Sequence, residues 1–186
     1  MTYKFFGDGG MVETAPIMLV DDPEKIEILN EPTRRQILRL LSDREMTLTQ
    51  IAKKLGLSKR SVWYHLRVLL NRDLIVLSRK KVNTYGIEEK YYRARASIMI
   101  GDFNKSSKKI REETLESSKD VVIGYLCAKK TDEPISDEKI EKMAEQFTEV
   151  IQKVIEDDGN MGKTRNQTKL AIYKEAFKRL EERKWI

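Results

Sequence analysis

The apolar positions in the first half of the chain follow a helical period in three consecutive segments. The first predicted helix begins at Asp22-Pro23, with aspartate as N-cap and proline in the first turn, and the second begins at Asn30-Glu31-Pro32. In the third, which begins after Thr47, apolar residues recur at i, i+3, i+4 and i+7, and this spacing predicts one buried helix face. A short strand is predicted before them, from Ile17 to Val20.

Capping residues predict where the third helix begins and ends and where a fourth helix begins. Thr47 and Gln50 fit a capping box, in which each side chain accepts a hydrogen bond from the other residue's backbone. Gly56 suits a left-handed C-cap, and Ser58 can cap the next helix at once. Two short helices that meet across such a turn form a helix-turn-helix.

Beyond Asp73 the pattern changes from helical to extended. Residues 74–77 and 89–93 are predicted to be the two strands of a hairpin. Their connection, residues 79–86, is long and basic, with turn-forming residues in its second half. A helix-turn-helix followed by a hairpin with a basic tip is a winged helix.

The rest of the chain is predicted to be entirely helical. One helix is expected from about Asn104 to Lys130, and two later segments repeat apolar residues at alternating spacings of three and four. This stripe is typical of helices that pack nearly antiparallel or across a dimer axis, and we expect a dimer seam because an exposed stripe would be unfavourable on a monomer. The expected seam consists of Phe147, Val150, Val154, Tyr173, Phe177 and Leu180.

The predicted fold class is therefore mostly α with a small β-hairpin. Three parts are expected: a flexible arm at residues 1–16, a winged helix-turn-helix domain at 17–97 and a helical dimerisation region at 98–186. The helical region could enclose an apolar effector pocket or be packed solid. Whether an effector binds is left open.

Positive charge is concentrated in the middle of the chain. The net charge is +6, and residues 31–100 alone hold 16 Lys and Arg against 6 Asp and Glu, a balance of +10. Such a block favours a polyanionic partner, because bound cations release the counterions of nucleic acid. A solvated basic face would give the same count.

The predicted fourth helix has two different faces. Val62, Leu66 and Leu69 cluster on one side, while charged and aromatic residues lie on the other. A DNA major groove admits one such helix, with cations and rings against base edges and phosphates. The alternative is that the aromatic residues pack on the wing, or that Trp63 belongs to the core.

The segments at 47–58 and 62–69, with residues 34–38 and 89–92, resemble the winged helix-turn-helix of ArsR-type (arsenical-resistance repressor) transcription regulators. The resemblance covers about residues 17–97. It implies a homodimer that places two recognition helices on a pseudo-palindromic operator in double-stranded DNA, more readily as a repressor than as an activator. The residues expected to contact DNA are Ser58, Lys59, Arg60, Ser61, Trp63, Tyr64 and Arg67 in the helix, and Arg79, Lys80, Lys81 and Asn83 in the wing.

The sequence departs from the metal-sensing members of that family. Its one cysteine, Cys127, and one histidine, His65, lie in different predicted domains, so we expect no metal site and no cofactor. Cys127 is expected to be a small buried hydrophobe, and His65 a hydrogen-bonded, half-buried anchor. Asp73 stands where many relatives have glycine, and aspartate tolerates the left-handed conformation that this turn can require.

Other function classes find little support in the sequence. No catalytic triad order, phosphate-binding glycine loop or histidine-rich motif is present, so an enzyme is not expected. The longest apolar runs are too short to span a membrane, and a cytoplasmic location is expected. The alternative function is a winged-helix chromatin-architectural or protein-interaction module that binds nucleic acid without sequence preference. The ratio of specific to non-specific affinity distinguishes the two.

Overall fold

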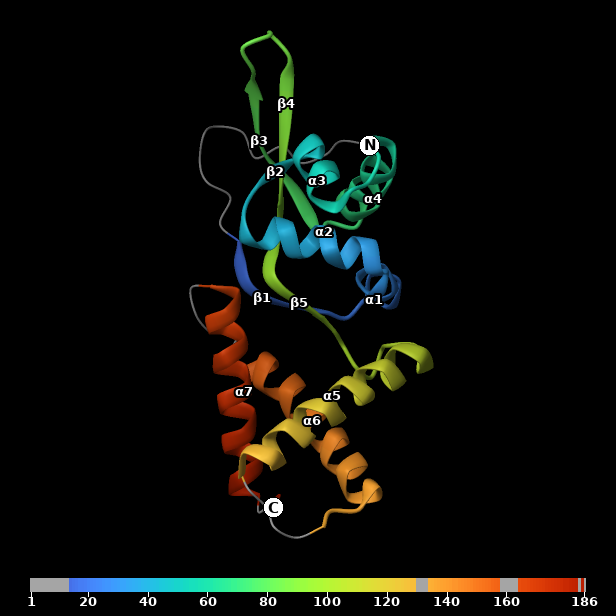
Figure 1. The fold of residues 1–186 in the computed structure, drawn as a ribbon, viewed down its shortest axis with the longest axis vertical. Helices are drawn as coiled ribbons and strands as arrows, with labels where there is room; N and C mark the ends of the chain where they lie inside the picture. Colours follow the sequence, from blue (N-terminus) through green and yellow to red (C-terminus); the bar gives the residue numbers. More distant parts are fainter. Residues whose placement is uncertain (1–13, 130–133, 158–163, 184, 186) are drawn as a thin grey trace.

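The computed structural model places a winged-helix part and a three-helix part on opposite sides of a two-stranded sheet (Figure 1). It describes residues 14–129, 134–157, 164–183 and 185. Seven helices lie within these described residues, together with two small sheets. The predicted fold class, mostly α with a small β-hairpin, is confirmed.

The winged-helix part contains four helices and a three-stranded antiparallel sheet in the order β2-β4-β3. Its helices are α1 (Pro23–Asn30), α2 (Pro32–Asp43), α3 (Leu48–Leu55) and α4 (Lys59–Asn71). Its strands are β2 (Met46–Thr47), β3 (Ile75–Val82) and β4 (Glu88–Ala94). The last two strands form a hairpin that projects beyond the helices (Figure 1).

Local signals set the starts of the first two helices, as predicted. The Asp22 carboxylate accepts the backbone N–H of Glu24 at 2.9 Å and caps α1, whose first residue is Pro23. Glu31 caps α2 in the same way, and Pro32 follows it. Proline fits the first helical position because its missing N–H would have no partner within the helix.

A strand that the sequence analysis did not predict joins the two parts. β5 (Ala96–Gly101) pairs in parallel with β1 (Ala15–Val20), with Ile17 opposite Ile98. The prediction of an all-helical region from residue 98 was therefore wrong at its start, because a short apolar run reveals neither its conformation nor a pairing partner so distant in sequence. The expected boundary at residue 97 lies inside β5. Most of the expected arm lies outside the described residues, and Ala15-Pro16 belong to β1.

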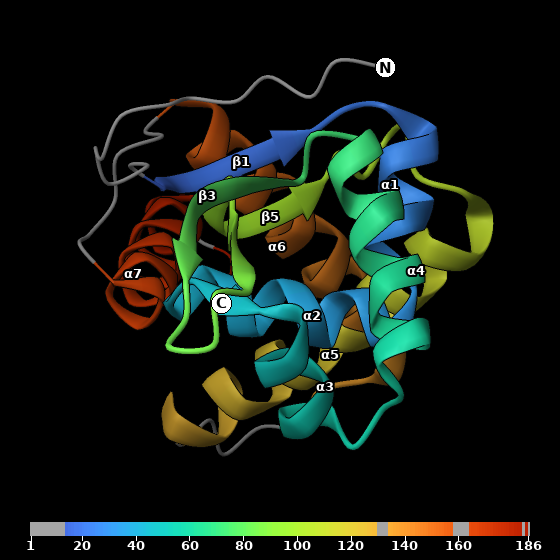
Figure 2. The same cartoon turned by 90° about the horizontal axis from the view of Figure 1, so that it is seen from above.

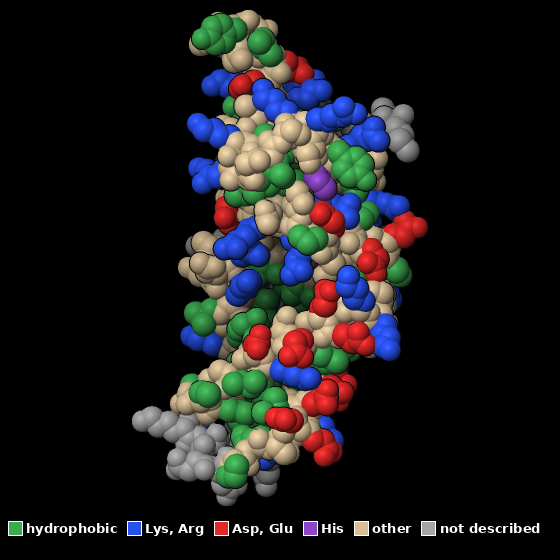
Figure 3. All heavy atoms as spheres, turned by 45° about the vertical axis from the view of Figure 1, so that its right-hand side comes forward, with side chains coloured by type: hydrophobic (Ala, Val, Ile, Leu, Met, Phe, Trp, Pro, Cys, Tyr) green, Lys and Arg blue, Asp and Glu red, His purple; other side chains and the backbone are tan. Residues whose placement is uncertain are grey.

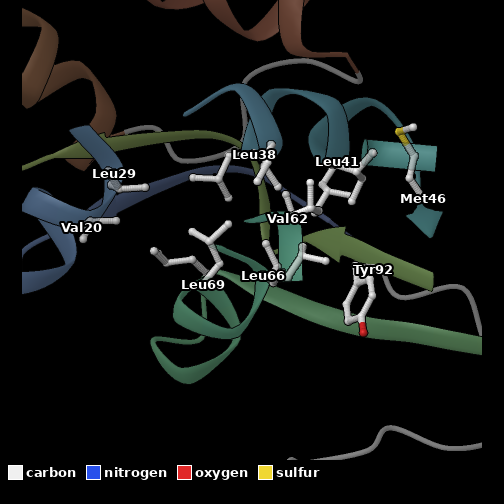
Figure 4. Packing of buried hydrophobic residues seen from close by; sticks show 14 of the residues in the cluster. Val20, Leu29, Leu38, Leu41, Met46, Val62, Leu66, Leu69 and Tyr92 are labelled. Atoms are coloured by element: carbon white, nitrogen blue, oxygen red, sulfur yellow. The ribbon is translucent and has the colours of Figure 1, made fainter. Parts of the chain in front are cut away.

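Two hydrophobic cores lie on either side of this small sheet. The first fills the winged helix, and Figure 4 shows side chains from α1, α2, α4, β1, β2 and β4 converging in it. The second lies among the three long helices. Since neighbouring strand residues point to opposite faces, Met18 packs against the first core while Ile17 and Leu19 pack against the second. The sheet of β1 and β5 is thus shared by the two cores, because one of its faces packs against each of them.

The helical part consists of α5 (Lys108–Lys129), α6 (Asp137–Asp157) and α7 (Arg165–Glu182). α6 packs between the other two helices, and α6 and α7 both contact the shared sheet. Seen from above, β1 and β5 run side by side with these helices behind them (Figure 2). The expected helix at about 104–130 is observed as α5, although it begins four residues later.

Candidate nucleic-acid interface

The turn between α3 and α4 has the predicted geometry. Thr47 Oγ1 accepts the N–H of Gln50 at 3.3 Å, and Gln50 Oε1 accepts the N–H of Thr47 at 2.9 Å, so the capping box is complete. Gly56 has a left-handed φ of 66°, which a residue without a side chain adopts readily. Ser58 Oγ accepts the N–H of Ser61 at 3.1 Å and caps α4. These bonds set the angle at which α4 leaves α3.

Helix α4 separates a buried face from an exposed one. Val62, Leu66 and Leu69 are fully buried in the first core. Trp63 is 45% exposed and Tyr64 56%, so neither aromatic side chain belongs to the core. The alternative that placed Trp63 in the core is wrong. Among the other expected DNA-contacting residues of α4, Ser61 is half-buried, and Ser58, Lys59, Arg60 and Arg67 are exposed.

The cations of α4 are not neutralised by neighbouring acids in the described chain. Within those residues, no carboxylate oxygen lies within 4.0 Å of the charged nitrogens of Lys59, Arg60 or Arg67. The helix therefore presents three cations and two aromatic rings on one solvated surface. Such a surface suits a polyanion with flat bases.

Glu31 connects the start of α2 to α4. Its Oε2 accepts the N–H of Arg34 at 2.8 Å and lies 3.6 Å from His65 Nδ1. Burial raises the pKa of Glu31, but the N–H bonds from Arg34 and Thr33 outweigh burial and leave the pKa below its ordinary value. His65 is half-buried as expected, but its buried Nδ1 has no hydrogen-bond partner among the described residues.

The turn between α4 and β3 contains a left-handed residue, as predicted. Asp73 has φ 58°, and Arg95 Nε donates to its Oδ1 at 3.2 Å. Aspartate tolerates this conformation better than most residues with a side chain.

The basic residues of the wing occupy a strand rather than a loop. Arg79, Lys80 and Lys81 lie in β3, which runs to Val82, and the connection is correspondingly shorter than predicted. The expectation of a basic loop from residue 79 was wrong, because three consecutive basic residues show no alternation of apolar and polar positions that would predict a strand. The cations therefore lie along the side of the wing.

Two of the wing cations interact with the wing itself. Arg79 donates to Glu45, and its guanidinium carbon lies 3.8 Å from the centroid of the Tyr91 ring. Burial raises the pKa of Glu45, yet hydrogen bonds from Ser78 and Arg79 leave the pKa below its ordinary value. Lys80 Nζ lies 3.2 Å from Glu88 Oε2.

The wing tip is a turn with exposed apolar and aromatic side chains. The side-chain oxygen of Asn83 accepts the N–H groups of Tyr85 at 2.9 Å and of Ile87 at 3.1 Å, so it builds the turn and is not available as an acceptor. Tyr85 is 85% exposed at the tip, and Val82 and Ile87 are also exposed. Tyr85 was not among the residues expected to contact DNA. The turn formers beside it were the available signal.

Helix α3 adds two exposed cations that the sequence analysis did not assign. Lys53 and Lys54 lie in its last turn, while Ile51 and Ala52 are buried. Their positions on the face opposite Ile51 and Ala52 follow from the helical period and were predictable from the sequence.

The expected dimer seam is mostly buried inside one chain. Phe147 is only 3% exposed, and Val150, Val154 and Leu180 are also fully buried. Phe177 stacks on Tyr125 of α5 with ring centroids 4.2 Å apart and contacts Phe147 at 5.2 Å. The stripe therefore holds α5, α6 and α7 together, which removes the reason for expecting a dimer seam on these residues. Tyr173 keeps 39% of its side chain exposed.

The cysteine, the possible metal ligands and the apolar character of the helices also bear on the predictions. Cys127 is exposed, so its expected role as a buried hydrophobe was wrong. Among the described residues, no three His, Cys, Asp or Glu side chains lie together in a way that could hold a metal ion. None of the helices in that part of the chain combines the length and apolar character of a membrane span.

The central segment of the chain is similar to known regulatory proteins. Residues 31–76 match the model of a family described as bacterial regulatory protein, arsR family. This segment is therefore similar to the helix-turn-helix of that family. The resemblance stated from the sequence is thus confirmed for the region from the cap of α2 into β3.

The chain also has a curated relative. The transcriptional repressor SdpR of Bacillus subtilis (strain 168) is 40% identical over 52 residues, which cover 28% of this chain and 58% of that protein. The chain thus matches little more than half the length of this relative.

Two solved structures show a weaker likeness. The adhesin competence repressor AdcR from Streptococcus pyogenes matches with TM-score 0.33 and 18% identity, covering 70% of this chain and 83% of that one. Its C-terminally His-tagged form gives TM-score 0.32 and 21% identity, with coverage of 72% and 88%. Likeness at this level says nothing about function.

Proposed function

We propose that the chain is a sequence-specific transcriptional repressor that binds double-stranded DNA through α4 and the wing, and that it acts in the cytoplasm as a homodimer without being an enzyme. The exposed face of α4 carries the proposal: three cations without a carboxylate partner in the described chain stand beside two solvent-exposed rings. This face lies in the segment that matches the arsR family, and a curated relative of the chain is named as a transcriptional repressor.

The roles of individual residues follow from where the side chains lie. Arg60, exposed in the first turn of α4, can donate two hydrogen bonds to a guanine edge in the major groove. Lys59 and Arg67 would contact phosphates, and Ser58 and Ser61 lie at the N-terminus of α4, where a helix favours anions. Trp63 and Tyr64 can pack against sugars or thymine methyl groups.

In the wing, Lys81 is the residue that we expect to contact phosphate most directly. It is exposed, whereas Arg79 and Lys80 already contact acidic or aromatic residues of the winged helix. The homodimer is proposed to use other surfaces than the buried stripe. Leu170 and Tyr173, exposed at i, i+3 on α7, are available for such a contact.

Selection of bound duplexes from a random pool tests this function. The dissociation constants of the selected duplex and of a random duplex are then compared. We expect the selected duplex to bind about 10³-fold or more tightly than the random one. Arg60→Ala should weaken specific binding by about 1–3 kcal/mol and relax the preference at one base position. Lys139→Ala is the matched control, because Lys139 is also exposed but lies in the first turn of α6.

Two outcomes would count against the proposal. Equal affinity for selected and random duplexes would indicate the architectural alternative, and an unchanged sequence preference in Arg60→Ala would remove Arg60 as a base reader. Light scattering of the protein on the selected duplex reports whether one or two chains bind, and one chain per site would reject the homodimer.

A further inference from the structure

A cavity of about 370 Å³ lies between the winged-helix part and the helical part. Its walls come from the end of α1, α2, β5, the residues after β5, α5 and the first turns of α7. A space-filling view shows a hollow at mid-height of the molecule, with hydrophobic side chains in its depth and Lys and Arg side chains beside it (Figure 3). The volume falls in the range of small-molecule sites.

Four cations line this cavity, two from each part of the protein. Arg35 and Arg39 come from α2, and Arg165 and Lys169 come from α7. Each pair is spaced at i, i+4, so both members lie on the same helix face. The lining contains no Asp or Glu, and none of the four cations forms an ion pair within the described residues.

This arrangement is unfavourable in the absence of a counter-charge. Like charges at i, i+4 destabilise a helix, and here two such pairs line one cavity. Burial lowers the pKa of Lys169, and the charges of Arg165 and Arg39 lower it further. Lys169 on α7 thus senses a cation of α2 across the boundary between the two parts.

Arg165 also has an unused hydrogen-bond donor. Its Nε is buried and has no hydrogen-bond partner among the described residues. A buried donor of a charged group is strongly destabilising when it remains unpaired. Arg35, Arg39 and Lys169 are exposed, so the cavity is open to solvent and to an entering ligand.

We propose that the cavity binds a small organic anion, with a carboxylate or phosphate group among the four cations and an apolar body against the hydrophobic lining. Planar guanidinium groups bind such anions through two parallel hydrogen bonds. The apolar part of the lining includes Leu38, Ile98, Phe103 and Ile110. A fully hydrated inorganic ion would leave these side chains without a contact.

A bound anion would affect both parts of the protein at once. It would remove the repulsion between α2 and α7, and α2 packs against α4. We therefore expect the anion to change the affinity for duplex DNA. This coupling rests on the proposed function, whereas the binding site itself does not.

Titration calorimetry on the full chain tests the site with phenyl phosphate and benzoate as anionic probes, at constant ionic strength. Benzyl alcohol is the neutral control of similar size. We expect saturable binding of at least one anion to one site per chain, and no binding of the alcohol. Binding of the alcohol as tightly as the anions, or no binding of either anion at millimolar concentration, overturns the proposal.

Variants then locate the site. Arg165→Gln with Lys169→Gln should weaken anion binding at least tenfold, while Lys174→Gln with Lys178→Gln, which removes two exposed cations from the same helix, should leave it unchanged. Equal affinity in both double variants overturns the proposal. If the first pair alters the circular dichroism of the free protein, Arg39→Gln on α2 makes the same test, and full affinity there overturns it equally.

A separate measurement tests the coupling. The dissociation constant of the selected duplex, measured with and without the bound probe, should change at least threefold. No change, with the probe bound, overturns the coupling and leaves the site intact. A protein that binds the probe but no duplex under any condition refutes the proposed function instead.

Discussion

Replacement of Glu31 should measurably destabilise the winged helix, because one carboxylate both caps α2 and faces α4. Its Oε2 accepts the N–H of Arg34 at 2.8 Å, and its Oε1 accepts the N–H of Thr33 at 3.2 Å. The same Oε2 lies 3.6 Å from His65 on α4. Glu31→Ala would leave the first N–H groups of α2 without these acceptors.

The size of the expected loss in the free energy of unfolding follows from the role of Glu31 as N-cap. Loss of an N-cap acceptor typically costs about 0.5–2 kcal/mol, and the favourable position of a carboxylate at a helix N-terminus is worth about 0.3–1 kcal/mol, partly the same energy. Glu31 keeps 30% of its side chain exposed, so solvent screens part of the charge. We expect Glu31→Ala to lower the free energy of unfolding by about 1–2 kcal/mol. Glu31→Asp should lose less, because aspartate is a preferred N-cap.

The loss should depend on pH in a predictable direction. Burial raises the pKa of Glu31, but the backbone N–H bonds of Arg34 and Thr33 outweigh it, so the folded-state pKa lies below the ordinary 4.5. The ionised carboxylate therefore stabilises the fold above pH 4.5, and its contribution disappears as the pH falls through the lower folded-state pKa. The difference between wild type and Glu31→Ala should be full at neutral pH and shrink in acid.

Urea unfolding of the wild type, Glu31→Ala and Glu31→Asp, followed by circular dichroism at neutral pH and at steps below pH 4.5, measures these differences. Glu27→Ala is the matched control, because Glu27 is exposed on α1, and it should change the stability by no more than about 0.5 kcal/mol. A loss below about 0.5 kcal/mol for Glu31→Ala at neutral pH would refute the capping argument. A loss that stays constant with pH would refute the role of the charge.

Two further predictions concern the helical part and the wing. Phe147→Asp places an unpaired charge in a buried aromatic cluster and should unfold the helical part, because the free energy of unfolding falls by more than the roughly 3–5 kcal/mol of a Phe→Ala change. Tyr173→Asp, at a partly exposed position, should keep the helical circular dichroism. Equal thermal stability of the two variants would contradict this prediction. Lys81→Ala should reduce the slope of log affinity for duplex DNA against log salt concentration by about 0.9, at an unchanged melting temperature of the protein. Arg79→Ala should lower that melting temperature, because Glu45 and Tyr91 lose their contact with the guanidinium. An unaltered salt slope for Lys81→Ala would show that this lysine of the wing does not contact phosphates.

The parts of the fold that the sequence predicted correctly are those set by local chemistry. The capping box of Thr47 and Gln50, the left-handed Gly56 and the left-handed Asp73 each depend on a few neighbouring residues, and each is observed. The faces of α4 were equally predictable, since a helix of known start assigns every side chain a direction. Trp63 stood at the border of the two faces, and only the packed structure shows that it is exposed.

The parts that were missed depend on contacts between distant residues. β5 is a strand because β1 lies beside it, and its own apolar run does not distinguish a strand from a buried helix. The stripe through Phe147 and Phe177 has the spacing of any helix that packs lengthwise on another, whether within one chain or between two. Only the position of α5, which fills the space against α6 and α7, shows that one chain satisfies the stripe.

The cluster of four cations in the cavity could not be predicted from the sequence for a related reason. Arg35 with Arg39, and Arg165 with Lys169, each look like the solvated side of an ordinary helix. They become a cluster only because the shared sheet brings the start of α7 toward α2, although about 130 positions separate the two pairs along the chain. A charge count along the sequence cannot detect such a cluster.

The shared sheet gives the proposed anion site two physical connections to the proposed DNA interface. β5 begins two residues after β4 ends, so the strand that lines the cavity continues the strand that forms the wing. On the other side, α2 lines the cavity with Arg35 and Arg39 and packs against α4 through the first core. An anion that changes the separation of α2 and α7 would therefore act on the wing through the backbone and on α4 through packed side chains. Because the two connections are independent, a variant that loosens one of them should weaken the coupling without abolishing it.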